Sequence, residues 1–456
     1  MTKEQLYQLF QLNSNSQAPS FVIYSTELTE RLSYTCNFIF QHVLNCNYKL
    51  TSDLKTFNES KELKINYSSN VLDNAFKIEP HNLLFEKGID QNHIPTHVTK
   101  NDLVYFNPNE TKCDLGFDLF SSVFYFISRY QEWQPFDKDR HHRFEASNSI
   151  QFQLKQHLKP LIDIWVNEFK LKLQKFFGSI QFTQKKFVYA STIDVDNLFA
   201  YKNKGQKRTI AGALKDIYLL DLKNLKRRLQ VVKGKLADPF DVYEQLNAIS
   251  KQSGVPLFYF FLQRTGTEFD RTIDPHSGAF EPVFEQLKKD KIEFGIHPSY
   301  NAHINENLIK EEFACVREHA QSAITISRQH YLRFDISKTP QLLINNGVVA
   351  DFTMGFASSP GYRAATFTPF CYFDLKNNKA TDLLMIPFVA MDGVYFNYSQ
   401  TPALEAQEQM IELATQAKQL NGIFVTVFHE RTMDEALYPG FKDLYLNLHE
   451  RLKAST

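Results

Sequence analysis

Four apolar segments in the second half of the chain each run directly into residues that can bind a metal ion or move a proton. The segments are 187–191, 292–296, 323–327 and 423–428, and the residues that follow them include Asp194, Asp196, His297, Arg328 and His429. A parallel barrel gathers the carboxyl ends of its strands on one face, so residues this far apart in sequence can share one site. Their side-chain types suit metal-assisted hydrolysis.

The first segment leads into two carboxylates, Asp194 and Asp196. In a straight strand they would point to opposite faces, but where the chain bends at a strand end both can reach one site. One could bind a divalent cation, which makes a bound water more acidic, while the other takes up the proton. The competing interpretation is that Asp196 and Asn197 only cap a helix.

His297 supplies an imidazole, the commonest protein ligand for a metal ion in this setting. A helix that begins near Pro298 would turn Asn301 to the same side, so its carbonyl oxygen is a candidate ligand, with His303 as the alternative. The competing interpretation is a loop histidine with an ordinary hydrogen bond.

The last two segments offer groups that assist a carboxylate and a leaving group. Arg328, or its competitor Arg333, could orient a catalytic carboxylate and hold it ionised. Tyr331 could stack on a sugar or lend its backbone amide to an oxyanion, and His429 could act as a general acid. The alternatives are a surface ion pair for the arginine and a structural hydrogen bond near Glu430 for the histidine.

Composition narrows the class of protein. The chain has 456 residues, enough for two or three domains, and its 51 basic and 51 acidic residues give no overall attraction to nucleic acid. The run from Lys202 to Arg208 is interpreted as a solvated loop, with a phosphate-binding role as the less favoured alternative. Five scattered cysteines argue against a disulfide framework or a structural zinc module. The chain lacks both a signal-like start and a long apolar run, so a cytoplasmic protein without a membrane span is expected.

The order of elements predicts an α/β protein in three parts. Residues 1–110 form a small α/β domain with strands at 21–24 and 103–106, and residues 111–180 form a helical bridge. In residues 181–456, strand-like and helical runs alternate, which is typical of one parallel barrel with outer helices. Further strands are expected at 257–262, 348–352 and 383–388, and helices at 114–133, 158–177, 239–253, 280–289, 305–321 and 404–419.

These motifs together resemble a known family. The order Thr-x-Asp-x-Asp at 192–196, His-x-Ser at 297–299, Arg-x-x-Tyr at 328–331 and a final strand ending in His429 is similar to that of the polysaccharide deacetylases of carbohydrate esterase family 4, the NodB homology domain. The resemblance covers roughly residues 186–450. Longer phrases at 117–144, 295–301 and 328–334 resemble a bacterial subgroup with an extra N-terminal domain.

The resemblance implies a distorted (β/α)7 barrel, a divalent metal with zinc as the expected ion, and hydrolysis of an acetyl group on a sugar. It assigns Asp194 as general base, Arg328 as the residue that orients it, and His429 as general acid. The implied metal ligands are Asp196, His297 and Asn301, and the residues expected along the substrate groove are Tyr300, Tyr331 and Arg363.

The chain departs from the family pattern in three places. Asn301 stands where the family has its third ligand, a histidine, and His330 stands where the family has a proline. There is no clear Asp-x-x-Asp-Trp segment, and the nearest stretches are 351–355 and 391–393.

The leading hypothesis is therefore a metal-dependent hydrolase that removes acetyl groups from an amino sugar in a saccharide or glycan precursor. Two alternatives stay open: a saccharide-binding barrel that has lost its metal site, and a hydrolase of another small amide. The sequence does not reveal the sugar, the linkage or the oligomeric state.

Overall fold

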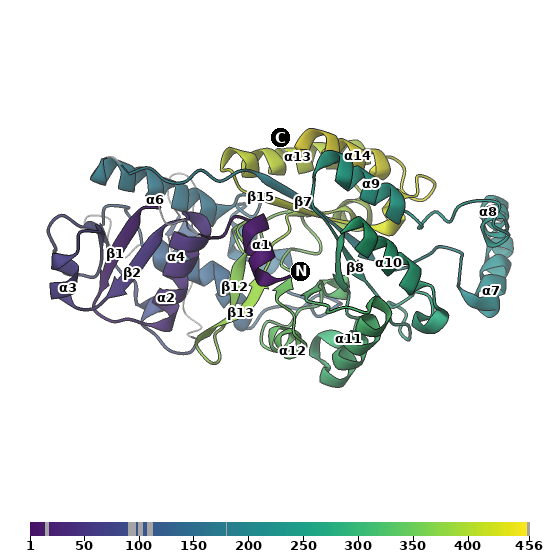
Figure 1. Ribbon diagram of the computed structural model, residues 1–456, viewed down its shortest axis with the longest axis horizontal. Helices are drawn as coiled ribbons and strands as arrows, with labels where there is room; N and C mark the ends of the chain where they lie inside the picture. The colour runs from purple at the N-terminus through teal and green to yellow at the C-terminus, as the bar shows by residue number, and fades with distance from the viewer. Residues whose placement is uncertain (14–17, 90–96, 99–103, 107–112, 179, 454–456) are drawn as a thin grey trace.

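Two parallel sheets organise the chain, one near the N-terminus and a larger one in the second half (Figure 1). The computed structural model describes residues 1–13, 18–89, 97–98, 104–106, 113–178 and 180–453. The expected boundary between residues 110 and 111 lies outside the described residues, as does Leu103 of an expected strand.

The N-terminal sheet has four parallel strands in the order β2-β1-β3-β4. The strands are β1 (Ser20–Ser25), β2 (Asn47–Thr51), β3 (Leu63–Tyr67) and β4 (Phe76–Ile78), and the helices between them are α2 (Glu30–Cys36), which continues as a π-helical turn over Asn37–Val43, and α3 (Leu54–Glu59). The strand expected at 21–24 is β1. A separate antiparallel pair joins β5 (His97–Val98) to β6 (Val104–Tyr105).

Two helices follow, α4 (Leu119–Ile127) and α6 (Leu161–Phe177), with a one-turn helix α5 (Ile150–Gln153) between them. α4 is shorter than the helix expected at 114–133 because Asp118 caps its start and Arg129 adopts a left-handed conformation just after its end. Every residue of α4 is buried, and the helix packs against both α2 and α6. The first helix, α1 (Lys3–Leu9), lies against the larger sheet, where Lys3 pairs with Asp382.

The larger sheet has nine strands in the order β12-β13-β11-β10-β9-β8-β7-β15-β14, and every pairing is parallel except that of β12 with β13. Its strands are β7 (Val188–Val195), β8 (Leu257–Phe261), β9 (Glu293–Ile296), β10 (Ile326–Ser327), β11 (Ala350–Asp351), β12 (Phe370–Asp374), β13 (Lys379–Met385), β14 (Ala390–Met391) and β15 (Ile423–His429). The sheet curls but leaves β12 and β14 as edges, so the α/β class is as expected and the barrel is incomplete.

Helices cover the outside of this sheet, as expected for parallel strands (Figure 1). They are α9 (Tyr243–Ser253), α10 (Phe280–Asp290), α11 (Glu306–Ala320), α12 (Thr339–Asn345), α13 (Ala403–Gln419) and α14 (Phe441–Leu452). All five residues of β8 are buried, which explains its uninterrupted run of apolar residues.

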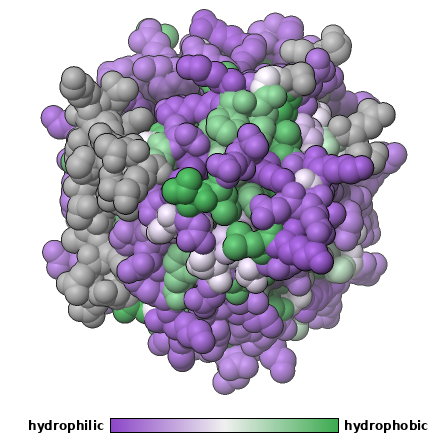
Figure 2. All heavy atoms as spheres, turned by 90° about the vertical axis from the view of Figure 1, so that its left-hand side faces the viewer, coloured by the Kyte–Doolittle hydropathy of each residue, from purple (hydrophilic) through white to green (hydrophobic). Residues whose placement is uncertain are grey.

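A helical arm projects away from the larger sheet at the end opposite the N-terminal sheet (Figure 1). It consists of α7 (Gly205–Tyr218) and α8 (Leu222–Val232). The run from Lys202 to Arg208, which the sequence suggests is a solvated loop, therefore passes into a helix at Gly205. The side of the molecule that carries the N-terminal sheet is mostly hydrophilic where its residues are described, with a small apolar cluster near its centre (Figure 2). Among the described helices, none is both long enough and apolar enough to cross a bilayer.

Candidate active site

Strand register brings the candidate residues together at the carboxyl ends of β7, β9, β10 and β15. Asp194 in β7 pairs with His429 in β15. On the other side of β7, Phe261 of β8 pairs with Ile296 of β9, and His297 follows directly after Ile296. Ser327 of β10 pairs with the same Ile296, and Arg328 follows directly after Ser327. The expected convergence of distant strand ends is present in the structure.

These residues open into a cleft of about 550 Å³, within the size range of small-molecule sites. Its lining combines polar and charged groups with the rings of phenylalanine and tyrosine side chains. The lining includes Asp194, Asp196, His297, His330, His429 and Arg431 together with Phe269, Tyr331, Tyr398 and Tyr438.

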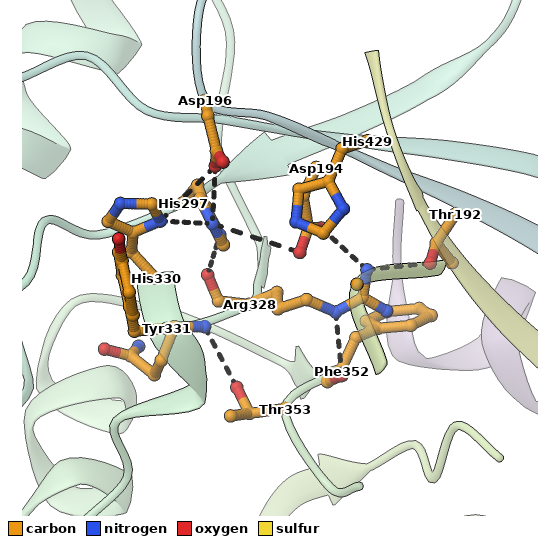
Figure 3. Close-up of polar contacts among 12 residues, drawn as sticks. Thr192, Asp194, Asp196, His297, Arg328, His330, Tyr331, Phe352, Thr353 and His429 are labelled. Atoms are coloured by element: carbon orange, nitrogen blue, oxygen red, sulfur yellow. Dashed lines mark hydrogen bonds and ion pairs between the residues drawn. The ribbon is translucent and has the colours of Figure 1, made fainter. Parts of the chain in front are cut away.

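Three buried groups meet closely enough to hold one metal ion: Asp196, His297 and His330. His297 Nε2 lies 3.0 Å from His330 Nδ1, and Asp196 Oδ1 lies 3.5 Å and 3.4 Å from these two nitrogens (Figure 3). Ligand atoms about 2.0–2.2 Å from one ion are separated by distances of this order.

Two backbone carbonyls fix the protonation of the rings. His297 Nδ1 lies 2.6 Å from the Arg328 carbonyl, and His330 Nε2 lies 3.1 Å from the Phe269 carbonyl. A carbonyl only accepts hydrogen bonds, so each of these nitrogens carries the proton and a neutral ring presents a lone pair at its other nitrogen. The two lone pairs then face each other and a carboxylate oxygen, an arrangement that needs a cation or a proton between them. Histidine ligands of metal ions are commonly held in this way.

Asp196 supplies a second sign of a missing partner. Its Oδ1 atom is buried without a hydrogen-bond partner among the described residues, while its Oδ2 atom accepts a hydrogen bond from Arg431. Burial opposes ionisation, but the positive charge of Arg431 holds the pKa of Asp196 well below its usual range. The donor set of one carboxylate and two imidazoles fits a zinc-like divalent ion.

Asp194 lies beside this group and is oriented by Arg328. Arg328 Nη1 donates to Asp194 Oδ1 and to the Thr192 hydroxyl, both at 2.7 Å, and Nε donates to the Phe352 carbonyl at 3.0 Å. The guanidinium is fully buried and sits 4.7 Å from the centre of the Phe260 ring. The second carboxylate oxygen, Oδ2, remains 3.9 Å from His297 Nε2, which places it next to the candidate metal position.

His429 is held by a buried carboxylate, Asp392. His429 Nδ1 donates to Asp392 Oδ1 at 2.6 Å, and Asp392 Oδ2 accepts from the His429 backbone amide and the Thr432 hydroxyl, both at 2.8 Å. Burial works against the charged ring, but Asp392 dominates and raises the pKa of His429 to about 9. The ring lines the cleft and is charged at neutral pH, so it can donate a proton there.

Asn301 lies outside the three-residue group, so the structure does not support it as a ligand. It is exposed, and its side-chain oxygen accepts a hydrogen bond from Arg333 Nη1 at 3.1 Å. Asn301 precedes the one-turn helix Ala302–Ile304 and is not among the residues that line the cleft. The alternative, His303, is buried beside the same arginine and likewise lies outside the group.

Two of the three residues expected in the substrate groove have structural contacts instead. Arg363 is buried and forms an ion pair of 2.7 Å with Glu132, which Arg129 also contacts at 2.7 Å. Tyr300 stacks on Phe269 with ring centroids 4.2 Å apart and lies behind the cleft wall. Only Tyr331 lines the cleft, where its backbone adopts a left-handed conformation with φ of 57°.

Three residues of the site are missing from the sequence-based assignment: His330, Asp392 and Arg431. His330 stands where the family has a proline, so the sequence marked it only as a departure from the family pattern. Asp392 belongs to one of the two stretches nearest to the absent Asp-x-x-Asp-Trp segment. Arg431 follows His429 by two residues, and no motif marked it.

Comparisons with known proteins give a partial match. Residues 21–178 match a family of unknown function, DUF7033. A search of curated proteins found no significant match.

Among solved structures, this chain is similar to a candidate polysaccharide deacetylase from Mycobacterium smegmatis, with 13% identity over 60% of this chain and 85% of that one and a TM-score of 0.39. A carbohydrate esterase family 4 pseudoenzyme from Bacillus anthracis has 9% identity over 57% of this chain and 62% of that one, with a TM-score of 0.29. The esterase family 4 domain of a xylanase from the hindgut metagenome of Trinervitermes trinervoides has 9% identity over 58% of this chain and 85% of that one, with a TM-score of 0.28. At these scores the functional proposal must rest on the geometry of the site.

Proposed function

We propose that this protein is a metal-dependent hydrolase that removes acetyl groups from an amino sugar of a saccharide or glycan precursor. The observation that carries the proposal is the group of Asp196, His297 and His330, in which two carbonyls turn both imidazole lone pairs toward an unpartnered carboxylate oxygen. The curled sheet is then a form of the distorted (β/α)7 barrel of carbohydrate esterase family 4.

A divalent ion held by these three residues, with zinc as the expected ion, would supply Lewis-acid activation of water and of the acetyl carbonyl. Asp194 Oδ2 serves as general base, since it lies beside the group while Arg328 occupies Oδ1 and keeps the carboxylate oriented. His429 serves as general acid and protonates the leaving amine, since Asp392 keeps the ring charged at neutral pH.

The cleft walls suit a sugar. The rings of Phe269, Tyr331, Tyr398 and Tyr438 offer apolar faces, and the side-chain amide of Asn397 can form hydrogen bonds with a ligand in the cleft. This mixture of stacking surface and polar groups supports a saccharide over a purely apolar amide.

Acetate release tests the proposal. Protein loaded with zinc, cobalt or manganese is expected to release acetate from acetylated amino sugars, and the Asp194→Asn variant is expected to release little. The Asn301→Ala variant is the matched control and should retain activity. Ammonia release in place of acetate would indicate a different amide, and the absence of both products from the metal-loaded protein across the panel would contradict the proposal.

One observation favours a second candidate, a saccharide-binding protein without hydrolytic activity. Arg431 already places a positive charge on Asp196 Oδ2, where it disfavours a second cation nearby. In this case sugars would bind in the cleft, but elemental analysis would find no stoichiometric metal, and Arg431→Met would restore metal binding.

A further inference from the structure

The two helices of the arm contact each other through polar side chains and expose their apolar side chains. The contact between α7 and α8 is polar: Asp216 accepts from Arg228 Nε at 2.7 Å and from the Asn224 amide at 2.8 Å. Arg228 also packs closely over Gly212, where a Cβ would lie 2.5 Å from Arg228 Nη1. In a helical hairpin stabilised by its own core, the apolar stripes would face each other at this contact.

The apolar side chains of the arm instead face outward. Ile210, Leu214 and Ile217 recur at helical spacing on the side of α7 opposite Gly212 and Asp216. Half of the twenty exposed large hydrophobic residues among those the structure describes lie in this short segment: Ile210, Leu214, Ile217, Tyr218, Leu219, Leu220, Leu222, Leu229, Val232 and Leu236. The most exposed, at the tip between the helices, are Tyr218 at 86% and Leu220 at 83%. Exposed apolar side chains concentrated in one short segment in this way indicate an interaction site.

The same segment is strongly basic in a chain that is neutral overall. Residues 202–236 contain eleven Lys and Arg against two Asp, a net charge of +9, whereas the whole chain has 51 of each sign. Six of the lysines are exposed and form no ion pair with any residue that the structure describes: Lys207, Lys215, Lys223, Lys226, Lys233 and Lys235. Apolar residues flanked by free lysines on a surface helix are typical of segments that lie in the interface of an anionic bilayer.

The net charge of the arm favours an anionic lipid surface over a second copy of the chain as its partner. A symmetric dimer through the arm would place two surfaces of net charge +9 against each other, whereas an anionic lipid surface supplies the opposite charge.

The base of the arm is tied to the cleft. Arg208 donates to the carbonyls of Arg271 and Thr272 at 3.0 Å and 2.7 Å, and Arg271 lines the cleft. On α8, Arg227 forms a two-pronged ion pair with Asp434, with both contacts at 2.8 Å. An arm seated on a membrane would therefore hold the cleft at a fixed position near the lipid surface.

We propose that α7 and α8 dock the protein on an anionic membrane surface. Given the function proposed above, the substrate is then a glycan carried on a lipid, presented to the cleft from the bilayer. The docking rests on the arm alone, and only the substrate class depends on the proposed function.

Vesicle co-sedimentation of the full chain tests docking without any activity measurement. Binding is expected to phosphatidylcholine vesicles that contain roughly one-third phosphatidylglycerol, and to weaken at high salt. The combined change Leu214→Ser, Leu220→Ser and Leu229→Ser is expected to lower partitioning at least about tenfold. The combined change Lys215→Gln, Lys223→Gln and Lys226→Gln is expected to lower it about fivefold per lysine at low salt.

The matched control replaces equally exposed apolar residues elsewhere: Val71→Ser, Leu404→Ser and Leu437→Ser. This variant should bind vesicles like the unchanged protein, and circular dichroism should show that both serine variants are folded. Docking is overturned if the unchanged protein does not bind anionic vesicles, or if the arm and control variants bind equally. It is also overturned if ultracentrifugation shows a dimer that the arm substitutions dissolve, since a second copy then covers the arm.

The activity of the arm variant on soluble and lipid-anchored substrates tests the proposed substrate class separately from docking. If the proposed function holds, the arm variant should keep full activity on a water-soluble acetylated amino sugar and lose at least about tenfold on a lipid-anchored one in the same vesicles. Equal activity of arm and control variants on the anchored substrate would overturn the lipid-linked assignment. Vesicle binding by a protein that releases no acetate would leave docking intact and contradict only the proposed hydrolysis.

Discussion

The two parallel sheets of this protein treat the polar groups at their strand ends in opposite ways. In the N-terminal sheet these groups are satisfied locally: the Ser25 hydroxyl donates to the Glu27 carbonyl, and the Asn66 amide donates to the Asn70 carbonyl. In the larger sheet, Asp196 Oδ1 has no hydrogen-bond partner among the described residues, and two imidazole nitrogens point at it.

Both sheets consist mainly of parallel strands, so this difference separates strand ends that only hold the fold from strand ends that could carry chemistry. Parallel pairing aligns strand ends in both, so convergence of polar residues alone does not mark a site. What marks it is a set of buried acceptors whose partners are absent, because leaving them so costs free energy unless a ligand completes them.

The largest expected effect follows removal of the proposed base. Asp194→Asn keeps the shape of the side chain but cannot take up a proton, so kcat is expected to fall about 10²–10⁴-fold. Metal content should stay unchanged, because Asp194 is not one of the three proposed ligands. A near-normal kcat in this variant would contradict the assignment of Asp194 as the general base.

The next largest effect is expected on zinc affinity, and it tests whether His330 or Asn301 is the third metal ligand. His330→Ala is expected to weaken zinc affinity at least about 100-fold, since loss of a direct ligand should cost no less than loss of its supporting hydrogen bond. Asn301→Ala should leave affinity unchanged, because Asn301 bonds to Arg333 outside the cleft. Competition against a fluorescent chelator measures both, and the reverse pattern would restore the assignment made from sequence.

A smaller effect concerns pH. Only the protonated His429 ring can donate, so activity is expected to fall as pH rises through about 9. Asp392→Asn removes the negative charge that raises this pKa, so the alkaline decline should move to lower pH, toward the ordinary histidine value of about 6.5. Thr432→Val keeps that charge and should leave the decline in place. A rate profile for Asp392→Asn that coincides with that of the unchanged protein would contradict the role of the pair.

The smallest effect on activity is expected in the N-terminal sheet. Asn66→Ala removes a buried side chain bonded to Ser68 and Asn70, which should cost about 1–3 kcal/mol of unfolding free energy. Denaturant unfolding measures the loss, while kcat/KM below the unfolding transition should not change. A selective loss of activity in a stably folded variant would mean that the two sheets are not as different as their strand ends suggest.

Sequence patterns were sufficient for elements whose periodicity reflects burial. The apolar runs at 257–262 and 423–428 became β8 and β15, and the amphipathic runs at 280–289 and 404–419 became α10 and α13 with ends shifted by one residue. The arm was missed because its apolar residues face outward and its basic residues resemble a loop.

The site was predictable where a residue directly ends a strand, as with Asp194, His297 and His429. It was not predictable where a turn decides direction: Asn301 turns toward Arg333, whereas His330 enters the ligand group through a turn with a left-handed residue at Tyr331. Arg363, expected along the groove, is paired with Glu132, a partner more than two hundred residues away in sequence that no local pattern indicates.

Anomalous diffraction from crystals of zinc-loaded protein shows directly whether these three residues hold the ion. One zinc peak is expected about 2.0–2.2 Å from Asp196 Oδ1, His297 Nε2 and His330 Nδ1, and no such peak is expected in crystals of His330→Ala. A zinc peak bound elsewhere, or an Asp196 carboxylate held only by Arg431 at full zinc occupancy in solution, would contradict this placement of the ion.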